Sequence, residues 1–206
     1  LNMGIGVMMI AHGLQMQLMG IRSVLEGFSV LTTGIFMSGY YVGYFIGSKT
    51  TPNFVSKVGH IRVFAAFASL ASLSALLAVV YVNPIMWTLS RFITGVSLVS
   101  CYVVTESWLN DRATNKNRGQ LLSAYMMVIF FGLAIGMLLL NVSEPKNYEP
   151  FILVSVLLSI ALVPILLTKR PAPKFKKIET ISIVELYKIS PLGTFLSLIH
   201  ISEPTR

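Results

Sequence analysis

The chain has 206 residues, of which 54% are hydrophobic and 12% charged, and its mean hydropathy is +0.74. Soluble domains carry about 25% charged residues, so this composition excludes a soluble globular fold and indicates an integral membrane protein surrounded by the lipid bilayer. The formal net charge of +8 does not indicate a nucleic-acid partner, because the basic residues lie in short stretches between apolar runs and form no basic face interleaved with aromatic residues.

Six apolar runs follow one another along the chain. A helix needs about 20 residues to cross the hydrocarbon layer. The runs of about this length are Asn2–Met19, Phe28–Ser48, Ile61–Val82, Ile85–Thr105, Leu121–Asn141 and Phe151–Thr168. Apolar residues are continuous in these runs instead of alternating with polar ones, which argues against membrane-spanning strands. The sequence therefore predicts an all-α membrane protein, with a bundle of six transmembrane helices over residues 1–168.

The connections between the runs alternate in charge. Basic residues gather after the second, fourth and sixth runs: Lys49, Lys57, His60 and Arg62; Arg112, Lys116 and Arg118; Lys169, Arg170, Lys174, Lys176 and Lys177. The other connections are short and contain few basic residues. Because basic loops stay in the cytoplasm, we expect the N-terminus and all three basic segments to lie inside.

The composition changes after the sixth run. Residues 169–191 are expected to form a cytoplasmic linker with a short amphipathic helix over Ile178–Ile189, and a seventh span is expected to begin at residues 192–195. Residues 196–206, Leu-Ser-Leu-Ile-His-Ile-Ser-Glu-Pro-Thr-Arg, resemble the translation of a transposon-end adapter used in DNA sequencing libraries. We therefore set this segment aside from the fold and expect the natural protein to continue past Phe195.

Polar residues inside the apolar runs indicate a cavity. Arg91 lies six residues inside its run, and a charge at the bilayer centre costs about 2.5–3.5 kcal/mol on insertion scales. Such an arginine faces a water-filled cavity or a partner, or else its side chain extends to the outer interface. Because imidazole titrates near neutral pH, His12 could carry a proton, or it could be a neutral side chain bonded to a neighbouring helix. The residues predicted to line the cavity are Arg91, His12, Gln15, Tyr41 and Tyr125.

Glycines recur every four residues in two of the runs. The second run contains Gly39, Gly43 and Gly47, and the fifth contains Gly132 and Gly136. Small residues at this spacing let helix backbones approach closely, so we expect both helices to lie close to a neighbour, either in rigid packing or with smooth faces along which the helices slide or rock.

The sequence contains no pattern typical of an enzyme or a metalloprotein. No Ser/His pair, paired aspartates or histidine-rich set recurs on runs that could face each other. The single cysteine, Cys101, lies inside an apolar run, where a packing role is expected. We therefore expect no catalytic residue, no metal and no cofactor.

Three short motifs resemble those of the major facilitator superfamily of secondary transporters. They are Ser56-Lys-Val-Gly-His-Ile-Arg62 in the connection between the second and third runs, Arg91-Phe-Ile-Thr-Gly95 in the fourth run, and Asn117-Arg-Gly119 before the fifth. The segment Val103–Asn110 adds a likeness to a bacterial branch of that family, the YcaD-like permeases. The resemblance implies the N-terminal six-helix half of a transporter in a bacterial inner membrane, with a second six-helix half as its partner.

The resemblance also implies a conformational latch built from six charged residues and one glycine in the first two basic connections and at the end of the fourth run. Its predicted members are Lys57, Gly59, Arg62, Glu106, Asp111, Arg112 and Arg118. The chain departs from the family pattern where Ser56 replaces an aspartate, Pro52 replaces a glycine, and Met137 follows Gly136.

The predicted function is transport of a small solute by alternating access. An arginine in the cavity favours an anionic or amphipathic substrate, and proton coupling would require Glu106 or a carboxylate of the second half, because the spans contain no central acidic residue. The alternative is a membrane scaffold or sensor that transports nothing.

Overall fold

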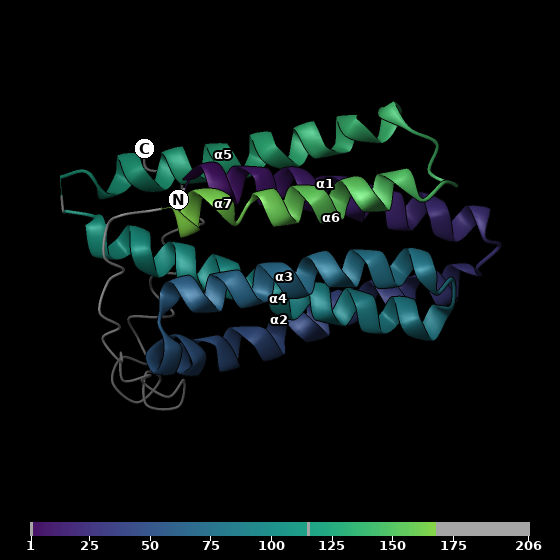
Figure 1. Cartoon of the computed structure of the whole chain (residues 1–206), viewed down its shortest axis with the longest axis horizontal. Helices are drawn as coiled ribbons and strands as arrows, with labels where there is room; N and C mark the ends of the chain where they lie inside the picture. The colour runs from purple at the N-terminus through teal and green to yellow at the C-terminus, as the bar shows by residue number, and fades with distance from the viewer. Residues whose placement is uncertain (1, 115, 168–206) are drawn as a thin grey trace, which may run out of the picture. The chain divides into compact units, whose positions relative to one another are not determined.

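The computed structural model describes residues 2–114 and 116–167, and Figure 1 shows their arrangement. The elements are α1 (Asn2–Leu25), α2 (Val30–Val58), α3 (His60–Val80), α4 (Pro84–Arg112), α5 (Arg118–Leu139), η1 (Leu140–Val142), α6 (Glu149–Ile160) and α7 (Val163–Leu166). No strand occurs in these residues, which confirms the predicted all-α fold. The predicted linker, the amphipathic helix and the possible seventh span lie outside the described residues.

Local sequence explains where several helices begin. Ser29 caps α2, since its hydroxyl accepts a hydrogen bond from the backbone N–H of Thr32 at 3.1 Å. Asn83 caps α4 by accepting from the N–H of Ile85 at 2.8 Å, and a proline follows it at the first helical position. Gly59 separates α2 from α3 with a φ of +87°, a conformation that favours glycine.

Five segments are long and apolar enough to cross a membrane: α1, α3, α4, residues 118–142, and residues 149–166. The remaining predicted span, the second run, corresponds to α2, which has 29 residues but is less apolar because it contains three tyrosines and four glycines within 34–47. Both α2 and α4 extend beyond the predicted runs, to Val58 and Arg112. Polar residues can continue a helix after it leaves the hydrocarbon layer, so apolarity alone underestimates helix length.

The last predicted run is interrupted in the structure. The sequence predicts one helix here, but α6 ends at Ile160 and α7 begins at Val163. Pro164 has no backbone N–H to donate to the carbonyl of Ile160 and its ring crowds that turn. The proline therefore breaks the helix although the surrounding residues remain apolar.

The helices pack most extensively in two pairs, α2 with α4 and α1 with α5. Helix α3 packs on α4 and α6, and α6 packs on α1, which joins the two pairs (Figure 1). A Cβ at Gly39 would lie 2.9 Å from the carbonyl oxygen of Thr88 in α4, and a Cβ at Gly132 would lie 2.9 Å from that of Gly6 in α1. The glycine spacing thus marks close contacts in both pairs, as predicted.

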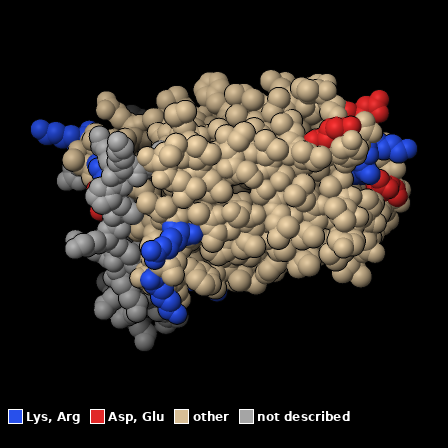
Figure 2. All heavy atoms as spheres, viewed as in Figure 1, with Lys and Arg blue, Asp and Glu red and all other residues tan. Residues whose placement is uncertain are grey.

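Charge is distributed unevenly over the face shown in Figure 2. Lys, Arg, Asp and Glu side chains lie toward its two ends, and the surface between them is uncharged. Large apolar side chains such as Phe130, Phe131 and Leu138 of α5 are exposed. An uncharged, apolar surface between charged ends is the arrangement expected of helices that span a bilayer.

Candidate functional site

Four polar side chains from three helices meet inside the bundle, and we call them the polar cluster: His12, Gln15, Tyr40 and Arg91. The rings of His12 and Tyr40 stack with centroids 5.5 Å apart. The guanidinium carbon of Arg91 lies 4.9 Å from the centre of the Tyr40 ring, which is a cation–π contact. Gln15 lies one turn from His12 on the same face of α1.

The polar cluster has unused hydrogen-bonding capacity. Among the described residues, His12 Nδ1, Gln15 Nε2, and Arg91 Nε and Nη1 are buried and have no hydrogen-bond partner. Arg91 is 1% exposed, so its guanidinium lies inside the bundle and does not extend to the surface. A buried cation without a carboxylate is costly, and residues that carry such a cost in membrane proteins usually serve function.

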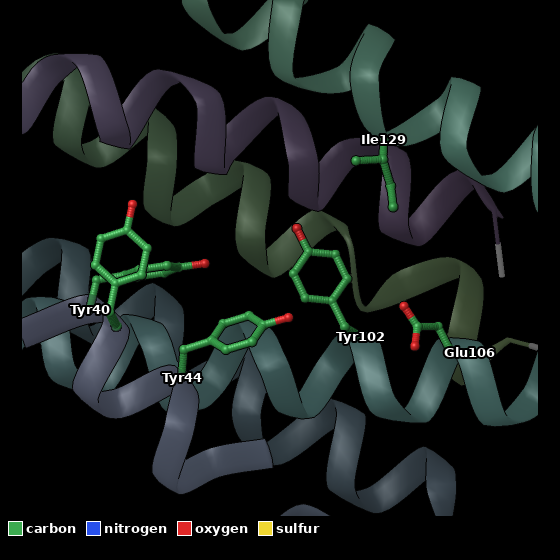
Figure 3. A pocket seen from close by; sticks show the side chains of 6 residues that line it. Tyr40, Tyr44, Tyr102, Glu106 and Ile129 are labelled. Atoms are coloured by element: carbon green, nitrogen blue, oxygen red, sulfur yellow. The ribbon is translucent and has the colours of Figure 1, made fainter. Parts of the chain in front are cut away.

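A pocket of about 340 Å³ opens beside the polar cluster. Its lining consists of Tyr40, Tyr41 and Tyr44 from α2, Tyr102 and Glu106 from α4, and Ile129 from α5. In Figure 3 the Tyr44 and Tyr102 side chains lie between Tyr40 and Glu106, and Ile129 faces them from a separate helix. The pocket is therefore aromatic along most of its length and acidic at one end.

Glu106 is the acidic group of the pocket. Its Oε1 accepts a hydrogen bond from the hydroxyl of buried Tyr125 at 3.4 Å. No Lys or Arg nitrogen of residues 2–114 and 116–167 lies within 4.0 Å of its carboxylate. The ion pair found among these residues joins Arg22 and Glu26, elsewhere in the chain. The pocket thus contains a carboxylate that the described part of the chain does not neutralise.

The residues predicted to line a cavity divide between these two features. His12, Gln15 and Arg91 lie together in the polar cluster, Tyr41 lines the pocket, and Tyr125 bonds to the acidic end of the pocket. Arg91 itself is not part of the pocket lining.

Sequence reasoning missed Tyr40, Tyr44 and Tyr102 as site residues, although a signal for them exists. Tyr40 and Tyr44 are four residues apart in α2, and Tyr102 precedes Glu106 by four in α4. Side chains four residues apart share one face of a helix. Each pair therefore forms one face that could have been predicted, but nothing in the sequence shows that the two faces meet.

The charged residues of the predicted latch are all exposed: Lys57, Arg62, Glu106, Asp111, Arg112 and Arg118. Within the described ranges none of them forms an ion pair with another. Arg118 instead donates a hydrogen bond to Asn110 at 3.3 Å, and His60 bonds to Ser107 at 3.0 Å, which ties the start of α3 to α4. The latch therefore stays a prediction.

Comparison with known proteins agrees with this architecture. The family model of the Major Facilitator Superfamily matches residues 1–200. The chain belongs to the major facilitator superfamily. The match extends past Phe195, where the segment that resembles an adapter begins.

Curated relatives of this superfamily chain include proteins from Escherichia and Yersinia. "Uncharacterized MFS-type transporter YcaD" of Escherichia fergusonii is 28% identical over 158 residues, which are 76% of this chain and 41% of the relative. The protein of the same name from Escherichia coli is 27% identical over 164 residues, 80% of this chain and 43% of the relative. An "Uncharacterized MFS-type transporter" of Yersinia pestis is 31% identical over 133 residues, which are 65% of this chain and 35% of the relative. The chain thus spans less than half the length of these relatives, and it is an integral membrane protein of a transporter family.

Proposed function

We propose that this chain forms the N-terminal six-helix half of a secondary transporter, which moves a small solute by alternating access. The observation that supports this most is a buried, unpartnered polar cluster beside an open pocket, inside helices that are otherwise apolar. The match to only 35–43% of each relative's length supports the assignment as one half. Transporters of this kind bind their substrate near the bilayer midplane, between two repeats.

The packing of the helices suits a rocking motion. The pairs α1–α5 and α2–α4 each hold together through glycine contacts, whereas α4 and α5 touch each other little. The pocket lies between these pairs, lined by α2 and α4 on one side and α5 on the other. Because α3 and α6 join the pairs, the six helices would move together against the second half, and the space between the pairs would face that half.

The charge of the two ends supports a cytoplasmic N-terminus. Six basic residues lie in and around the turns from α2 to α3 and from α4 to α5: Lys49, Lys57, Arg62, Arg112, Lys116 and Arg118. In and around the opposite turns lie Arg22 and Lys146 with three glutamates, Glu26, Glu144 and Glu149. By the positive-inside rule the first set is cytoplasmic, and the bacterial relatives indicate an inner membrane.

Two experiments test the proposal. Reading the undisturbed genomic frame beyond Phe195 should reveal six further spans, and a stop codon at that point would contradict the assignment as one half.

The complete protein in liposomes should then accumulate at least one solute from a panel of anionic, cationic and neutral metabolites, measured by mass spectrometry of the lumen. Arg91→Ala should abolish this uptake, whereas Lys146→Ala in an outer turn should leave it unchanged. Absence of uptake for every solute would favour a scaffold or sensor.

Proton coupling can be tested in the same liposomes. If Glu106 carries the coupling proton, an inward pH gradient should drive uptake by the unmodified protein but not by Glu106→Gln. The Glu149→Gln variant, which removes a carboxylate at the start of α6, is the matched control. Equal gradient dependence in both variants would remove Glu106 from the coupling step.

A further inference from the structure

The tyrosine pocket has the chemistry of a cation site. We propose that it binds an organic cation with apolar substituents, with the charged head beside Glu106. This proposal names the substrate class of the transporter proposed above and rests on that function. It differs from the preference for an anion that an arginine in the cavity would suggest.

The tyrosine rings supply one part of this recognition. A cation is attracted to the face of an aromatic ring, and cages of such rings bind quaternary ammonium groups. Tyr41 is 65% exposed and Tyr44 38% exposed, so the protein leaves much of both side chains uncovered. The ring of Tyr40 already contacts Arg91 and His12. The rings available to a ligand are therefore Tyr41 and Tyr44, and the partly buried Tyr102, which also lines the pocket.

The charge of the pocket decides which sign of ligand it accepts. Glu106 lines it and has no cationic partner in the described part of the chain, with only the Tyr125 hydroxyl bonded to it. Arg91 lies fifteen residues earlier in α4, about 22 Å away along the helix axis, and does not line the pocket. The carboxylate would repel an anion. Its attraction to a cation would offset part of the free-energy cost of the water that the carboxylate loses when a ligand binds.

The size and the remaining wall of the pocket limit the ligand further. A volume of about 340 Å³ is near the lower end of the 300–1,000 Å³ that small-molecule sites usually have. Ile129 gives the side facing α2 and α4 an apolar surface. A quaternary ammonium carrying one aromatic or aliphatic substituent matches these properties. Benzyltrimethylammonium is a suitable probe.

Binding of this probe to the 206-residue chain can be measured directly. The chain is placed in nanodiscs of zwitterionic lipid, which avoids adsorption of charged probes, and radiolabelled benzyltrimethylammonium is equilibrated with it by dialysis against empty nanodiscs. We expect saturable binding that excess unlabelled choline weakens and that benzoate leaves unchanged. Glu106→Gln, which keeps the shape of the side chain, should weaken binding at least about tenfold. The matched control Glu149→Gln should bind like the unmodified chain.

Two substitutions at Tyr102 separate the ring from its hydroxyl, which donates to Met9 Sδ at 2.9 Å. Tyr102→Phe keeps the ring and should bind within about twofold of the unmodified chain, whereas Tyr102→Leu should lose about two- to fivefold through the missing cation–π contact. Unchanged helicity by circular dichroism confirms that each variant is folded. If Glu106→Gln loses binding with its helicity intact, the loss comes from the charge.

Several results would overturn the proposal. The first is the absence of saturable cation binding, and the second is equal binding by Glu106→Gln and the unmodified chain. The third is saturable benzoate binding that Arg91→Gln removes, because this would assign an anion to the polar cluster instead. The liposome experiment fails independently of this one. A transporter of another solute class would show uptake without binding the probe, and a scaffold could bind the probe without uptake.

Discussion

The contact between α2 and α4 at Gly43 makes a quantitative prediction about stability. A Cβ added at Gly43 would lie 2.9 Å from the carbonyl carbon of Phe92 and 3.1 Å from its Cα, and it would meet the carbonyl oxygen more closely still. Ordinary contact begins at 3.4 Å. The obstructing atoms belong to the backbone and cannot change rotamer, so Gly43→Ala must push the two helices apart by about half an ångström or more.

The expected cost follows from two opposing effects. Overpacking of a well-packed interface costs about 1–3 kcal/mol, and alanine improves helix propensity over glycine by about 1 kcal/mol at most. Gly43→Ala should therefore lower the free energy of unfolding by roughly 0–2 kcal/mol. Gly34→Ala in the same helix is the matched control, because nothing lies within 4 Å of a Cβ there. It should change stability by about 0 to +1 kcal/mol.

Unfolding by SDS in mixed detergent micelles measures both variants. Trp87 and Trp108 are the two tryptophans of the chain and both are buried in α4, so their fluorescence reports on the helix that Gly43 contacts. Gly95 makes the reciprocal contact, since a Cβ there would meet the backbone of Tyr40. The double variant with Gly95→Ala and Gly43→Ala should lose less free energy of unfolding than the two single variants lose together, because one substitution already separates the helices. Equal stability of the Gly43 and Gly34 variants would refute the close-contact argument.

Three further predictions concern polar contacts. Arg91→Met should raise the free energy of unfolding by at least about 1 kcal/mol, because it removes a buried charge that has no carboxylate partner. A loss of stability in the SDS titration would mean that the guanidinium has a stabilising partner. Thr51→Val removes the 2.7 Å hydrogen bond to Ser100 between α2 and α4 and should cost about 1 kcal/mol, whereas Ser38→Ala, which loses only a bond to its own helix, should cost less. Arg22 donates hydrogen bonds to Glu26 and to the carbonyls of Pro145 and Lys146. Arg22→Gln should therefore accelerate amide hydrogen exchange in residues 143–148 by at least about fivefold. Unchanged exchange would show that this contact does not order the turn.

The polar cluster and the tyrosine pocket place opposite charges along one helix. Arg91 is buried near the end of α4 that follows the α3–α4 turn, and Glu106 lies near the other end. Neither has an ion-pair partner among the residues that the structure describes. Helix α4 thus carries a buried cation and an exposed anion, neither of them ion-paired within the described residues, and these give two sites for charged groups of a ligand or of a second half.

Sequence alone determined the membrane class, the six helices and most of their starting points. These features are local: a continuous apolar run predicts a span wherever it occurs, and caps such as Ser29 and Asn83 act on backbone groups two or three residues away. The spacing of Gly39, Gly43 and Gly47 also predicted a tight helix contact. The ends of α2 and α4 and the break at Pro164 were missed, because apolarity reports the hydrocarbon layer and not the helical hydrogen bonds.

Only the tertiary structure decided which polar side chains meet. Tyr40 joins His12 and Arg91 across three helices, and Glu106 meets Tyr125 across two. Each pair is far apart in sequence, and the rotation of one helix against another is set by backbone contacts such as that of Gly95 with Tyr40. Hydropathy contains no information about this rotation. The sequence therefore predicted a polar cavity, whereas the separation of an arginine cluster from an acidic tyrosine pocket followed from how the helices pack.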